Sequence, residues 1–143
     1  MKKLGRGVLF LSAKKGNGRN GEGDFIRFKD GTIMFAYTEY ISDGDGDHDI
    51  AQISAVFSTD EGESWGGKRI LVPCGEEDVN VMSVSLLRMA NGDVGLFYGR
   101  KYYANDGTLC IDNMLRRSSD EGETWSEPIS CIKDKEDYFV VAN

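Results

Sequence analysis

The feature that most constrains this chain is an eight-residue segment that occurs twice. Residues 58–65 read STDEGESW and residues 118–125 read SSDEGETW, so the second copy follows the first by 60 positions. A second landmark keeps nearly the same spacing, because an Asp-Gly step at 30–31 and an Asn-Gly step at 91–92 lie 61 positions apart. Two landmarks in one register indicate a chain built from repeated structural units.

Each repeat is predicted to consist of four short strands. Asp-Gly and Asn-Gly steps between apolar segments are strong hairpin signals, and no segment sustains the i, i+3, i+4, i+7 spacing of an amphipathic helix. The expected strands are 24–29, 32–40, 50–58 and 68–73 in the first unit, and 81–89, 94–101, 109–118 and 128–132 in the second. A further strand is predicted at 8–13, and residues 138–142 are similar to the first strand of another unit.

The charge of the chain narrows the classes of function. With 17 basic and 24 acidic residues, the net charge of −7 argues against a nucleic-acid-binding protein, which needs a basic surface for phosphate. The sequence has no apolar run long enough to span a membrane. The run at 8–11 is also too short for the core of a secretion signal, so we expect a cytoplasmic protein. No cofactor is expected.

The repeated segment has the pattern SxDxGxxW, which we interpret as a structural lock between the third and fourth strands of each unit. Its aspartate can accept hydrogen bonds from backbone N–H groups of the turn, and its serine hydroxyl can add another. The glycine permits a positive φ, and the tryptophan can pack on the neighbouring sheet. A ligand site at the two aspartates is the alternative. The residues concerned are Ser58, Asp60, Gly62, Trp65, Ser118, Asp120, Gly122 and Trp125.

Two such segments, each closing a four-stranded unit, resemble the Asp-box (BNR) repeats of the sialidase (neuraminidase) superfamily. The resemblance implies an all-β fold, a six-bladed β-propeller in which one repeat forms one blade, and hydrolysis of a terminal sialic acid from a glycan. This chain would then hold a flanking strand and loop at 7–23, blades at 24–73 and 81–132, and the start of a third blade at 138–143. We therefore expect the N-terminal portion of a propeller, inactive by itself.

The resemblance also implies that the active site lies on the face opposite the repeated segments, where the loop with sequence DGDGDHD at 43–49 is expected. Three interpretations of this loop stay open: a calcium loop, a solvated acidic loop and a catalytic loop. The calcium pattern is incomplete, because His48 and Ser54 stand where an EF-hand needs glycine and glutamate, and no metal is expected. Sialidases carry their acid/base aspartate in this loop of the first blade, a place that fits Asp47, with Asp49 as the alternative. An acid at Asp47 requires partial desolvation and a raised pKa.

Substrate-binding residues are less clearly marked. The resemblance implies an arginine at the start of the first blade, but residues 21–25 read GEGDF, and Arg19 is the nearest substitute. Glu22 and Asp24 would repel a sialate carboxylate and suit sugar hydroxyls, so a neutral glycan is an alternative substrate. His48 beside the catalytic candidate could hydrogen-bond a carboxylate or a substrate hydroxyl.

Arg100 and Lys101 end the sixth expected strand, where they either reach the site or form a solvated pair. A non-catalytic carbohydrate-binding propeller is the alternative to an enzyme. In either case the partner is a glycan, and open blade edges are expected to drive self-association.

Overall fold

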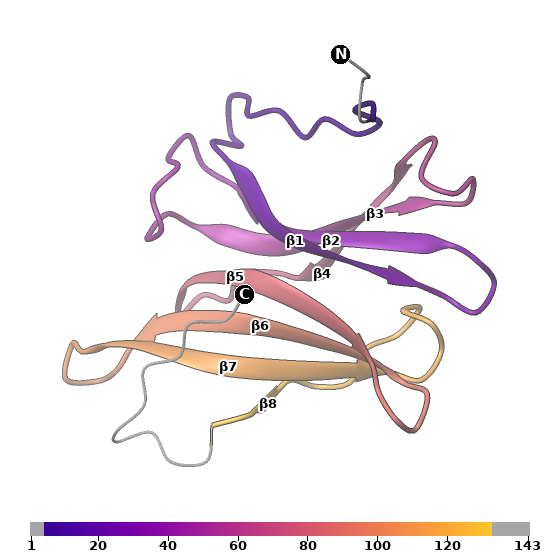
Figure 1. The fold of residues 1–143 in the computed structure, drawn as a ribbon. Coiled ribbons are helices and arrows are strands. Elements are labelled where there is room, and N and C mark those ends of the chain that lie inside the picture. Colours follow the sequence, from indigo (N-terminus) through magenta and orange to yellow (C-terminus); the bar gives the residue numbers. More distant parts are fainter. Residues whose placement is uncertain (1–4, 133–143) are drawn as a thin grey trace.

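The chain, described from a computed structural model over residues 5–132, forms two four-stranded antiparallel sheets and no helix in that range. The first sheet has the order β1-β2-β3-β4 and the second the order β5-β6-β7-β8, so every strand pairs with its neighbour in sequence. Figure 1 shows one sheet lying on the other. The strands are β1 (Asn20–Arg27), β2 (Ile33–Tyr40), β3 (Ala51–Ser58), β4 (Gly66–Val72), β5 (Asp78–Arg88), β6 (Val94–Tyr103), β7 (Leu109–Ser118) and β8 (Ile129–Ser130). Within the described residues, no helix could span a membrane.

The eight strands predicted inside the repeats are confirmed, with ends that differ by a few residues. The strand predicted at 8–13 is wrong, because this segment has irregular backbone. Its apolar side chains lack a buried surface to pack on, as the 79% exposure of Phe10 shows, so alternation alone does not make a strand. The segment predicted at 138–142 lies outside the described residues.

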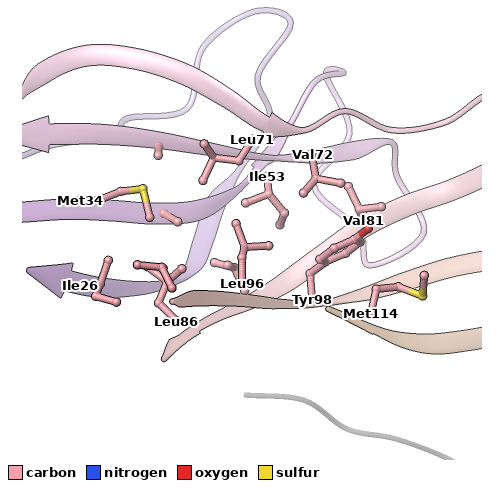
Figure 2. Close-up of a cluster of buried hydrophobic side chains, with 14 of the residues drawn as sticks. Ile26, Met34, Ile53, Leu71, Val72, Val81, Leu86, Leu96, Tyr98 and Met114 are labelled. Atoms are coloured by element: carbon pink, nitrogen blue, oxygen red, sulfur yellow. The ribbon is translucent and has the colours of Figure 1, made fainter. Parts of the chain in front are cut away.

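One apolar core lies between the two sheets (Figure 2). Side chains alternate between the two faces of a strand, and the inward positions of both sheets are apolar. Met34 and Ile53 enter the core from the first sheet, and Val81 and Leu96 enter it from the second, all of them buried. Burial of one such side chain contributes about 1.5–3 kcal/mol. Each sheet therefore depends on the other for its stability.

The two repeated turns lie at the same end of the sheets (Figure 1) and form the same hydrogen bonds. In the first turn, Ser58 Oγ donates to Asp60 Oδ1 at 2.8 Å and accepts from the Gly62 N–H at 2.8 Å, while Asp60 Oδ1 accepts from the Ser64 N–H at 2.9 Å. The second turn repeats these bonds among Ser118, Asp120, Gly122 and Thr124 at 2.7–2.9 Å. These turns lock β3 to β4 and β7 to β8.

The second turn also joins the two repeats. Glu121 accepts two hydrogen bonds from the Arg88 guanidinium, both at 2.7 Å, and one from the Lys29 N–H at 3.0 Å. The tryptophans of the two turns differ: Trp65 Nε1 donates to the Gly62 carbonyl at 3.0 Å, whereas Trp125 Nε1 has no hydrogen-bond partner among the described residues.

Candidate functional site

A cluster of polar side chains lies at the end opposite the repeated turns, where three segments meet. The segment before β1 pairs with the loop after β2, because the Gly18 N–H donates to the Ser42 carbonyl at 2.7 Å and the Gly16 N–H to Asp43 Oδ1 at 2.6 Å. Strands β5 and β6 reach the same loop from the second sheet. We call this cluster the loop-end site; its members are Arg19, Glu22, Tyr40, Asp47, Asn80 and Lys101.

The first repeat supplies a guanidinium, a phenol and a carboxylate. Arg19 Nη2 donates to Asp47 Oδ1 at 2.8 Å and to the Tyr40 hydroxyl, and the guanidinium carbon lies 4.2 Å from the centre of the Tyr40 ring. The hydrogen bond and the charge of Arg19 hold the pKa of Asp47 below its ordinary value. Burial raises the pKa of Tyr40, so its hydroxyl stays protonated at neutral pH.

The raised pKa that an acid at Asp47 requires is not present in this arrangement. Its side chain is 66% exposed, so water solvates the charge, and a cation lies beside it. Both effects favour the ionised form. In this structure Asp47 is a carboxylate at neutral pH and has no proton to donate.

Two side chains of the second repeat bind the backbone of the loop that contains Asp47. The side-chain amide of Asn80 donates to the carbonyls of Asp47 and Asp49, both at 3.0 Å, and the Lys101 ammonium donates to the Asp47 carbonyl. Asn80 is fully buried, and among the described residues its Oδ1 atom has no hydrogen-bond partner. Burial lowers the pKa of Lys101, and the nearby charges of Asp47 and Glu22 oppose that change. Asp47 is thus positioned through its own backbone.

Glu22 lies in a bulge of β1 beside the second sheet. The pairing of β1 with β2 shifts between Gly21 and Asp24, and Glu22 between them has a φ of 50°. Glu22 Oε2 accepts hydrogen bonds from Ser83 Oγ at 3.1 Å and Thr38 Oγ1 at 3.4 Å. A bulge redirects a side chain out of the regular alternation, and here it directs the carboxylate to the boundary between the sheets.

Three of the predicted site residues bind partners that are not members of the loop-end site. Asp24 Oδ2 accepts from the Leu86 N–H at 2.8 Å and so joins the two sheets. Asp49 Oδ2 accepts from the Gly46 N–H at 2.7 Å and closes its own loop. Arg100 pairs with Asp78 at 2.6 Å.

Arg100 and Lys101 do not share one role, either as two site residues or as a solvated pair. Successive strand residues point to opposite faces, so only Lys101 joins the loop-end site. His48 is exposed on the loop, where its charge contributes to the lowered pKa of Asp47.

The acidic loop does not form a metal site in this geometry. Within residues 5–132, no group of three or more His, Cys, Asp or Glu side chains is placed to hold a metal ion. The carboxylates of Asp43 and Asp49 instead accept hydrogen bonds from the backbone N–H groups of Gly16 and Gly46.

Tyr40 and Asn80 belong to the site but are missed by the sequence analysis. A signal was present, because four members of the site occupy two pairs of matching positions in the repeats, and Glu22 contacts its own matching residue Ser83. Glu22 and Ser83 are 61 positions apart, and the same offset relates Arg19 to Asn80 and Tyr40 to Lys101. Applying the repeat offset to Arg19 and Lys101 identifies both missed residues.

Comparison with known proteins shows which structures have a similar fold. No family model and no curated protein matches the chain. Among solved structures, the Hadza microbial sialidase Hz136 is similar with a TM-score of 0.63 and 21% identity, over 81% of this chain and 27% of that chain. A protein of unknown function from Dyadobacter fermentans DSM 18053 is similar with a TM-score of 0.67 and 18% identity, over 82% of this chain and 37% of that chain. At such identities the likeness shows the fold alone. The chain therefore has a sialidase-like fold, and it spans 27% and 37% of the lengths of these two proteins.

Proposed function

We propose that this chain is part of a sialidase-like exo-glycosidase, which releases a terminal sialic acid or a related sugar from a glycan. The observation that carries the proposal is the meeting of Arg19, Tyr40 and Asp47 at the end opposite the repeated turns. The turns themselves have the Asp-box pattern, and each closes a four-stranded sheet, as a blade of a propeller would require. The likeness to a sialidase adds support at the level of fold.

In this proposal Asp47 is the acid/base residue, with Asp49 as the alternative. As an exposed carboxylate hydrogen-bonded to Arg19, Asp47 is ionised and a weak base before a ligand binds. A bound sugar that separates the two side chains and excludes water would raise its pKa, because both effects that favour the charged form would then weaken. Arg19 would turn its guanidinium fork to the sugar. We expect this chain by itself to bind sugar without hydrolysing it.

A non-catalytic carbohydrate-binding protein is the second candidate. It is favoured by the lowered pKa of Asp47, because a residue that only binds hydroxyl groups needs no proton to donate.

The binding part of the proposal is tested by NMR titration of the ¹⁵N-labelled chain with methyl glycosides. We expect shifts in residues 41–50 and in the side-chain amide of Asn80, and we expect Arg19→Ala to remove them. Shifts confined to the opposite end, or no shifts with any sugar, would contradict a glycan site here.

Catalysis is tested by assaying the complete gene product for sugar release. Asp47→Asn is expected to lower kcat by about 10²–10⁴-fold, the usual contribution of a general acid or base. Sugar binding without release in the wild-type protein would favour the second candidate.

A further inference from the structure

Strained backbone conformations occur at matching positions in the two repeats. Among the described residues, four non-glycine positions have a positive φ: Glu22 (50°), Glu61 (59°), Ser83 (59°) and Glu121 (58°). They form two matching pairs, one in the repeated turns and one in bulges of β1 and β5, the first strand of each sheet. Strained residues persist where the surrounding structure holds them in place, and they are concentrated at functional sites. Because the bulge occurs in both repeats, it is a regular part of the fold.

The paired bulges place Glu22 where a ligand of the loop-end site would contact it. Its carboxylate is held from the second sheet by Ser83, the matching residue of the other bulge. It is exposed, and it lies close enough to Arg19, Tyr40 and Lys101 to influence the pKa of each. Glu22 therefore presents a hydrogen-bond acceptor to the same space as Asp47.

The charges of the site are balanced before any ligand binds. The two cations, Arg19 and Lys101, donate hydrogen bonds to the side chain and the backbone carbonyl of Asp47. The two anions, Glu22 and Asp47, face water. A sugar carboxylate would thus meet two like charges and cations that already have partners, whereas sugar hydroxyls can donate to both carboxylates.

We propose that Glu22 determines the specificity of the loop-end site and selects an uncharged sugar over one that carries a carboxylate. The inference rests on the proposed glycan function and, within it, favours the neutral glycan over sialic acid as the substrate. Glu22 accepts hydrogen bonds from ring hydroxyls, and its charge repels acidic sugars. The strained bulge aims this carboxylate, and Ser83 and Thr38 hold it.

The test compares the chain with its Glu22→Gln and Glu22→Gly variants, by NMR titration with methyl α-sialoside and with methyl galactoside, glucoside and N-acetylgalactosaminide. Glycine is suited to a positive φ, so the second variant removes the carboxylate without adding strain. Glu127→Gln is the matched control, because this exposed glutamate lies near the repeated turn at the other end.

We expect the wild-type chain and the control to bind at least one neutral glycoside more tightly than the sialoside. Both Glu22 variants should bind neutral glycosides about tenfold more weakly, which is the effect of losing one charge-assisted hydrogen bond. They should also reduce or reverse the preference for neutral glycosides over the sialoside. A wild-type preference for the sialoside, or a preference unchanged by both variants, would overturn the specificity role while the glycan function stands. Failure to bind any of these sugars would overturn both.

Discussion

At the turn end, the two repeats place the same or similar residues at matching positions, whereas at the loop end they place different ones. Ser58 and Asp60 recur as Ser118 and Asp120 with the same hydrogen bonds. At the loop end, Arg19 corresponds to Asn80, and Tyr40 corresponds to Lys101. The two repeats thus share a fold but place different functional groups at the loop end.

The difference follows from what each end must do. Every sheet needs its own turn between its last two strands, so the requirements of the turn apply to both repeats alike. The loop-end site is a single place that both repeats share, and each supplies a different part. The first supplies exposed charged groups, and the second supplies the buried donors Asn80 and Lys101 that hold the loop.

The largest expected effect concerns the core, which belongs to both repeats equally. Leu96→Ala should destabilise the chain by about 2–5 kcal/mol, because it empties space between the sheets. Leu87→Ala, at a neighbouring position that is 54% exposed, is the control and should change stability by about 0.5 kcal/mol or less. Urea unfolding followed by fluorescence, in Trp65→Phe and Trp125→Phe backgrounds, should give one common midpoint. Two separate midpoints would show that the repeats unfold independently.

A smaller loss of stability is expected for substitutions at the turn end, and the loss should be equal in the two repeats. Ser58→Ala and Ser118→Ala should each cost about 1–3 kcal/mol, because each removes a buried hydroxyl that satisfies a backbone N–H. Chemical denaturation measures both. A clear loss at one turn and none at the other would contradict the equivalence of the turns.

The acid stability of the chain should depend on the second turn. Hydrogen bonds from the side chain and backbone of Thr124 and from Ser118 lower the pKa of Asp120 from 3.8 to about 2. A folded-state pKa below the unfolded value adds stability that is complete above the unfolded pKa and is lost as the pH falls through about 2. Asp120→Asn should therefore flatten the dependence of the free energy of unfolding on pH between about 5 and 2. An unchanged slope would contradict the assignment.

The smallest effect is local and distinguishes the loop end. Arg19→Gln should raise the pKa of Asp47 toward its ordinary value, because it removes the charge and the hydrogen bond that favour the carboxylate. Titration of the ¹³C carboxyl signal measures this pKa, with Lys68→Gln as a control for the loss of one positive charge elsewhere. A pKa of Asp47 that does not change would show that the ion pair is absent in solution.

Much of the fold could be predicted from the sequence because its signals are local. Alternation and the Asp-Gly and Asn-Gly steps identify the eight strands of the repeats without knowledge of their neighbours. The strand predicted at 8–13 failed for the same reason, since a strand also needs a partner.

The site was only partly predictable, because its members meet through the packing of one sheet on the other. Arg19, Glu22, Asp47 and Lys101 were among the candidates, whereas the tasks of Asp24 and Arg100 depend on partners in distant strands. The pKa of Asp47 depends on its exposure and on the placement of Arg19, which sequence spacing does not give.

The consecutive order of the strands also sets an order of assembly during synthesis. The first sheet is complete in sequence at Val72, before the second begins at Asp78. The ribosome releases the N-terminal sheet first, so its hydrogen bonds can form while its inward face still lacks a cover. Strand β5 is the first part of the second sheet that can cover this face, and the bond from the Lys29 N–H to Glu121, across 92 positions, can form only after the second turn has been synthesised.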